Sequence, residues 1–242
     1  MPGCNMGRRS TLGYNVFEDP RVRRQFVTKV LFIVGINLSF TSAAMAICVT
    51  VVPIRRFLRQ YWWIALPAAL IIFAIHIMMC YCRYLFRQSP IKWILLVIYV
   101  ICHAVLVSCL AVKFSPLIVL LAFGICAVLV AFLCLFAKFA PCDFTSCYSF
   151  IFIIGIILIC LGIAAFFFRQ VYIAYIGFGV FAYSIFIVYD LQLVIGGKMH
   201  KRQYDEDDFI IASMVLYHDV IHLFMYILRL AGWIDDDDDD DD

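Results

Sequence analysis

Long apolar stretches separated by short polar segments make up most of this chain. Seven of the stretches approach or exceed the roughly 20 residues that an α-helix needs to cross about 30 Å of hydrocarbon. The pattern predicts an all-α membrane protein, a bundle of seven transmembrane helices, because a helix satisfies its own backbone hydrogen bonds in lipid. The expected spans are residues 30–52, 61–82, 93–112, 116–137, 148–168, 171–195 and 209–228.

Two parts of this pattern depart from a simple series of uninterrupted spans. The fifth and sixth spans are separated only by Arg169 and Gln170, but a single helix over both would be about 70 Å long, more than twice the hydrocarbon thickness. We therefore expect the chain to turn there. The seventh span contains polar residues, and it either crosses the membrane completely or enters and returns as a re-entrant helix; the interrupting residues are Ser213, His218, Asp219 and His222.

Composition supports the membrane assignment. The chain is 65% hydrophobic and 15% charged, with a mean hydropathy of +0.98, whereas soluble domains are about 45–50% apolar and about 25% charged. A soluble globular protein is excluded. Eight of the 17 acidic residues form the closing run 235–242, which leaves nine acids against 19 bases in the rest of the chain. This basic charge suits loops that meet anionic lipid headgroups. The sequence has no pattern of basic and stacking aromatic residues typical of a nucleic-acid-binding groove, so nucleic acid is not an expected partner.

Charge also predicts domain organisation and orientation. We divide the chain into an N-terminal segment (1–29), a helical bundle (30–231) and an acidic C-terminal tail (232–242). If the N-terminus is cytoplasmic, the cytoplasmic segments hold 13 Lys and Arg residues and the opposite segments hold five. The positive-inside rule therefore predicts a cytoplasmic N-terminus.

Two carboxyl groups lie within the apolar spans, Asp190 in the sixth and Asp219 in the seventh. Each would cost about 2.5–3.5 kcal/mol at the centre of a bilayer, so both should face the interior of the bundle. Two carboxyl groups at hydrogen-bond distance in a dry site share a proton, and calcium, which prefers carboxylate oxygens, could compete for the site. We expect a pair that senses protons and gates calcium. The plainer alternative is that each aspartate only hydrogen-bonds a neighbouring helix.

Three further residues are candidate partners of this pair. Arg83 lies at the end of the second span, where it either extends toward the headgroups or pairs with Asp190. His218 and His222 flank Asp219 in the sequence HDVIH, which differs from the zinc-protease signature HExxH by one methylene group in the acid. Because the sequence offers no obvious third ligand, we expect interhelical hydrogen bonding by these histidines and no metal site.

Four segments together resemble the transmembrane Bax-inhibitor-motif family. IVYDLQLVIGGK (187–198) and LYHDVIHLFMYILR (216–229) are similar to its closing signature. VRRQFVTKV (22–30) and DFTSC (143–147) resemble its lifeguard, or glutamate-receptor-associated, branch. The chain departs from the family at Leu191, where a Thr is usual, and in lacking the long Pro/Gly/Tyr-rich N-terminal extension of this branch.

The resemblance implies a calcium leak protein of the endoplasmic reticulum or Golgi membrane that limits apoptosis, with Asp190 and Asp219 as its pH-sensing pair. It implies no enzymatic activity and no cofactor, calcium being a permeant or weakly bound ion. Expected partners are the lipid bilayer, calcium and membrane proteins of cell-death or calcium-release pathways. Two other hypotheses stand beside it: a non-conducting membrane scaffold, and an intramembrane zinc hydrolase that uses His218 and His222.

Overall fold

The computed structural model describes residues 20–139, 144, 148–195, 204 and 206–240. Within these ranges the chain forms eight α-helices and no strand, and seven of the helices are long and apolar enough to cross a membrane. These results confirm the predicted fold class. The long helices are α1 (Pro20–Thr50), α3 (Ala65–Tyr81), α4 (Ile91–Ala111), α5 (Pro116–Phe139), α6 (Tyr148–Phe167), α7 (Arg169–Ile195) and α8 (Phe209–Asp240).

The helix boundaries agree with the apolar pattern to within a few residues at most ends. The break between α6 and α7 falls at Phe168, one residue before the predicted turn. Helix α1 already begins at Pro20, within the segment assigned to the N-terminal domain, and α8 continues through the acidic run to Asp240. Helix α8 is unbroken, so the described chain does not turn back at the polar residues of the seventh span.

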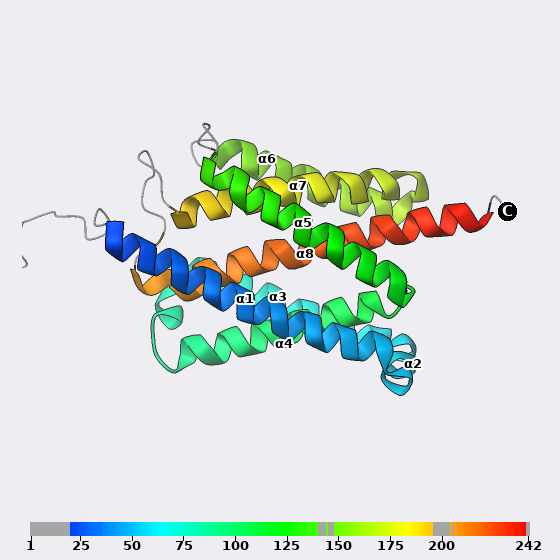
Figure 1. Ribbon diagram of the computed structural model, residues 1–242, viewed down its shortest axis with the longest axis horizontal. Helices are drawn as coiled ribbons and strands as arrows, with labels where there is room; N and C mark the ends of the chain where they lie inside the picture. The colour runs from blue at the N-terminus through cyan, green and yellow to red at the C-terminus, as the bar shows by residue number, and fades with distance from the viewer. Residues whose placement is uncertain (1–19, 140–143, 145–147, 196–203, 205, 241–242) are drawn as a thin grey trace, which may run out of the picture.

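Helix α8 forms the centre of the bundle. It runs between a group formed by α1, α3 and α4 and a group formed by α5, α6 and α7 (Figure 1), and it packs against α7, α5, α1 and α4. In its most apolar stretch 83% of the residues are buried, compared with 11–56% in the other six long helices. The outer helices instead expose Leu, Ile and Phe side chains. This distribution suits a bundle whose outer surface meets lipid and whose polar residues lie on an enclosed helix.

A short helix that the apolar pattern did not predict, α2 (Val52–Gln60), follows α1. Its Arg59 donates through Nε to the carbonyl of Val112 at 2.6 Å, and Arg55 donates through Nη2 to the carbonyl of Phe114 at 2.8 Å. Carbonyls at the end of a helix have no partner within the helix. The two arginines, one turn apart, therefore cap the carbonyl of Val112 at the end of α4 and that of Phe114 in the connection to α5.

Helices α7 and α8 approach each other closely at Gly179. A Cβ atom at this position would lie 2.3 Å from ring carbons of Tyr226, which is only 5% exposed. The Tyr226 hydroxyl donates to the hydroxyl of Tyr175 at 2.6 Å. The absence of a side chain at Gly179 thus lets α8 place an aromatic ring directly on the backbone of α7.

Polar contacts join the segments at the end of the bundle where α1 and α8 begin and α7 ends. We call this the α1 end. Arg87, in the connection between α3 and α4, donates to both carboxylate oxygens of Asp208 at 2.7 and 2.9 Å. Asp208 lies just before α8 and is 1% exposed. Arg23 of α1 donates to the carbonyl of Ile195, the last residue of α7. These bonds fix the start of α8 and the end of α7, the two segments that carry the predicted acidic pair.

Candidate functional site

The structure brings Asp190 and Asp219 together. Asp190 lies five residues before the end of α7 and Asp219 lies ten residues after the start of α8, about 8 and 15 Å along the respective axes. Their carboxyl groups are hydrogen-bonded to each other. Asp219 is 5% exposed and Asp190 is partly buried. The two acids therefore meet between α7 and α8, toward the α1 end.

The hydrogen bond requires a shared proton, because ionised carboxylates offer only acceptors and one of the two groups must supply the donor. The Oδ2 atom of Asp219 is buried, and no donor group of another described residue reaches it. A buried acceptor without a hydrogen-bond donor is energetically costly. The site can thus hold a proton between the two carboxyl groups, which supplies the donor that their buried oxygens otherwise lack.

Tyr204 and Arg83 lie at the edge of this pair. Burial raises the pKa of the Tyr204 hydroxyl, the negative charges of Asp190 and Asp219 raise it further, and the positive charge of Arg83 opposes them. Arg83 is the first residue of a 3-10 turn (Arg83–Phe86) after α3. Arg83 and the acidic pair thus act on the same hydroxyl with opposite signs. The sequence singled out Arg83, but it gave no signal for Tyr204, which precedes the last acidic loop in the chain.

The described contacts of His218 and His222 lead away from the acidic pair. The Nδ1 atom of His218 lies 3.2 Å from Nε2 of His103 on α4. The Nδ1 atom of His222 donates to the carbonyl of His218 at 3.0 Å, and its ring stacks on Tyr183 of α7 with centroids 5.2 Å apart. As predicted, the histidines make interhelical contacts. The sequence missed His103 as their partner because a single histidine in an apolar span does not reveal which helix it faces.

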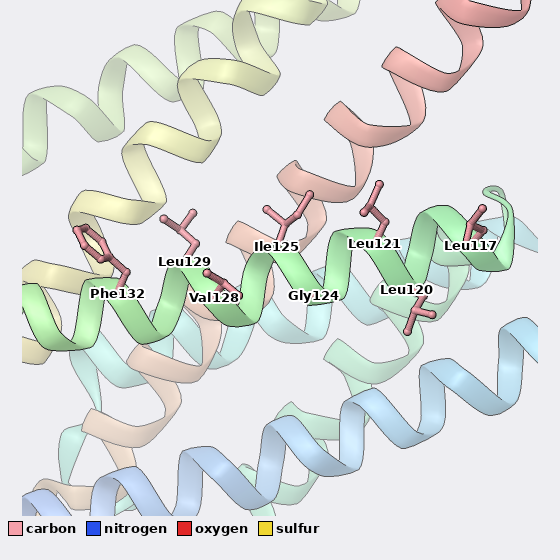
Figure 2. Close-up of a pocket in the computed structure, with 8 residues that line it drawn as sticks. All are labelled: Leu117, Leu120, Leu121, Gly124, Ile125, Val128, Leu129 and Phe132. Carbon is pink, nitrogen blue, oxygen red and sulfur yellow. The ribbon is translucent and has the colours of Figure 1, made fainter.

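The surface of α5 carries a groove with a volume of about 790 Å³. Figure 2 shows that every residue lining it comes from α5. All are apolar, and several are largely exposed, among them Leu117 at 75% and Val128 at 73%. A groove without polar side chains offers no ligands to an ion. It therefore belongs to the lipid-facing surface and not to the acidic site.

Comparison with known proteins agrees with this architecture. The family model described as "Inhibitor of apoptosis-promoting Bax1" matches residues 23–236. Protein lifeguard 3 of Homo sapiens is 27% identical over 228 residues, which cover 92% of this chain and 73% of the relative. Protein LIFEGUARD 4 of Arabidopsis thaliana is 30% identical over 235 residues, covering 94% of this chain and 92% of the relative.

The match spans nearly all of the membrane bundle and includes both aspartates. Among the segments that carried the resemblance, residues 143, 145–147 and 196–198 lie outside the described structure, whereas the region around Asp219 lies within α8. With seven helices able to span a bilayer, the chain is an integral membrane protein. It belongs to the Bax inhibitor family, whose members are associated with the inhibition of apoptosis.

Proposed function

We propose that this protein is a pH-sensitive calcium leak pathway of an intracellular membrane, the endoplasmic reticulum or Golgi, and that it limits apoptosis by lowering the calcium content of the store. The observation that carries the proposal is the hydrogen bond between Asp190 and Asp219. A shared proton ties α7 to α8 where the two carboxyl groups meet. Loss of that proton leaves two negative charges side by side in a poorly solvated site.

The chemistry of the pair suits calcium. Carboxylate oxygens are preferred calcium ligands, and a deprotonated pair would present four of them, among them the buried Oδ2 of Asp219. Arg83 and Tyr204 are the charged and titratable neighbours on the loop side. If the N-terminus is cytoplasmic, as the charge distribution predicts, the α1 end and the acidic pair near it lie toward the cytoplasm. Cytoplasmic pH would then set its protonation.

Calcium flux into proteoliposomes that contain the purified protein and an internal calcium indicator tests the proposal across pH 5–8. Asp190→Asn and Asp219→Asn should each change the flux and flatten its pH profile, because an amide cannot exchange the shared proton. Asp207→Asn is the matched control. Asp207 lies at the same end of the bundle but is exposed, so its variant should follow the unmodified protein.

The sign of the response distinguishes two uses of the pair. Flux that rises with pH indicates that repulsion between the ionised carboxylates separates α7 from α8. Flux that decreases as pH rises indicates that the ionised pair holds a calcium ion and blocks the path. If both amide variants retain the flux and pH profile of the unmodified protein, or if the purified protein conducts no calcium, the proposal is wrong.

A further inference from the structure

Three histidines from two helices meet inside the bundle. One ring nitrogen from each of His103, His218 and His222 lies within 4.8 Å of the others. His103 is on α4 and is 0% exposed, while His218 and His222 are on α8 and are partly exposed. The HDVIH sequence offered two nitrogens on one helical face and lacked a third ligand. Helix α4 supplies that ligand.

The hydrogen bonds of His103 and His222 each leave one ring nitrogen with a free lone pair. The Nδ1 atom of His103 donates to the carbonyl of Tyr99 at 3.0 Å, and the Nδ1 atom of His222 donates to the carbonyl of His218 at 3.0 Å. In a neutral imidazole, a proton on Nδ1 leaves Nε2 with a free lone pair. Metal-binding histidines are commonly oriented in this way, with the second ring nitrogen held by a carbonyl.

We propose that His103, His218 and His222 bind one borderline-soft divalent metal ion, with Zn²⁺ as the reference ion, and that the bound ion fastens α4 to α8. Ligands of a tetrahedral zinc ion with Zn–N bonds of about 2.0 Å lie about 3.3 Å apart. The Nε2 atom of His103 and the Nδ1 atom of His218 are already 3.2 Å apart. Side-chain rotation that closes the remaining gaps by no more than about 1.5 Å would complete three ligand positions, leaving the fourth for water.

Besides this rotation, metal binding requires the shift of one proton within His218. Since Nε2 of His103 carries a lone pair, Nδ1 of His218 is the donor in the bond between them. When the metal enters, this proton moves to Nε2 of His218 and frees Nδ1 as a ligand, with no change in net ring charge. Three neutral imidazoles suit zinc, copper or nickel, whereas calcium and magnesium prefer oxygen. The metal site is therefore chemically distinct from the acidic pair.

The neighbouring His76 is not a ligand in this assignment. Its Nδ1 donates to the carbonyl of Ile72 at 2.9 Å, and its Nε2 accepts from the Tyr99 hydroxyl at 3.2 Å. Both ring nitrogens are already used, although the ring lies beside His218 with centroids 4.5 Å apart. His76→Gln therefore makes a matched control, a histidine removed from the same cluster with the three ligands left in place.

The test measures Zn²⁺ binding to the purified full-length protein in detergent, after chelator treatment, by competition with a chromophoric zinc indicator. We expect one tight equivalent that His103→Gln and His222→Gln each weaken by about tenfold or more. His76→Gln should retain it within about threefold. Weak sites on the acidic tail and the cysteines are common to all variants and cancel in the comparison. In the unmodified protein, but not in the two ligand variants, zinc should also raise the unfolding temperature, because it binds only the folded arrangement.

Co²⁺ provides a second readout that does not depend on the glutamine variants folding. Co²⁺ bound to the unmodified protein should show the visible absorption of a four-coordinate nitrogen site. His222→Cys should keep stoichiometric binding and add a sulfur-to-cobalt charge-transfer band. The proposal is overturned if the unmodified protein binds no stoichiometric zinc, if folded His103→Gln and His222→Gln bind as tightly as the unmodified protein, if His76→Gln weakens binding equally, or if His222→Cys gives no new band.

Discussion

The close contact between α7 and α8 at Gly179 makes a quantitative prediction about stability. In Gly179→Ala the new Cβ would start 2.3 Å from the Tyr226 ring, whereas carbon atoms in contact lie about 3.5–4.0 Å apart. The ring or the helix must therefore move by more than about 1 Å. Overpacking of this kind costs about 1–3 kcal/mol, and losing the bond from Tyr226 to Tyr175 adds about 0.5–1.5 kcal/mol.

The matched control is Gly177→Ala, two residues away on the same helix, where a Cβ would meet nothing within 4 Å. Both substitutions gain the same helix propensity, about 1 kcal/mol, which cancels when they are compared. Gly179→Ala should therefore be about 2–4 kcal/mol less stable than Gly177→Ala.

Thermal unfolding in detergent, followed by circular dichroism, measures this difference. At about 2–4 °C per kcal/mol for a chain of this size, the two midpoints should differ by about 5–15 °C. In a Tyr226→Leu background the gap should shrink, because the atoms that clash are gone. Equal midpoints for the two alanine variants, or a gap that persists without the tyrosine ring, would refute the packing argument.

Two further predictions concern the α1 end. Arg87→Ala should lower the free energy of unfolding by about 1–3 kcal/mol, because the substitution removes the bidentate partner of the buried Asp208. This is less than the full cost of breaking a buried ion pair, because the Arg87 side chain is 40% exposed. An unchanged denaturation midpoint would contradict the prediction. Tyr204→Phe should reduce the loss of stability above about pH 10, because a raised pKa in the folded state stabilises the fold only below the unfolded value of about 10 and this contribution is lost as pH rises. Midpoints measured at pH 8 and pH 11 test this, and an equal alkaline loss with and without the Tyr204 hydroxyl would count against it.

Hydropathy alone located the seven long helices, because a helix that must cross a bilayer needs an uninterrupted apolar length that few other structures require. It missed α2, whose nine residues are too few to span and whose arginines obscure its apolar side. Its role depends on the carbonyls of Val112 and Phe114, which follow α4 and lie more than 50 residues away along the chain. Contacts of that kind leave no periodic signal in a single sequence.

The acidic pair could be anticipated because a carboxyl group in a membrane span must find a partner, and the chain offers two such groups. The energetic cost of burying a polar side chain did not reveal the partners of the other polar residues, such as His103 and Asp208. A single histidine at position 103 satisfies the same apolar pattern whether it faces α3, α7 or α8. In the sequence Asp208 is one of four consecutive acids (205–208), and only the fold shows that its side chain is buried.

The enclosed position of α8 has a consequence for biogenesis. Helix α8 leaves the ribosome after the other six described spans, and its mean hydropathy of 1.6 is the lowest of the seven. The six preceding long helices are therefore in the membrane before α8 can pack between them. Because its polar residues disfavour insertion of α8 on its own, contacts with the earlier helices have to favour its insertion. A chain that ends before residue 209 would leave α1, α4, α5 and α7 without the helix against which all four pack, so the two outer groups of helices would lose their common contact.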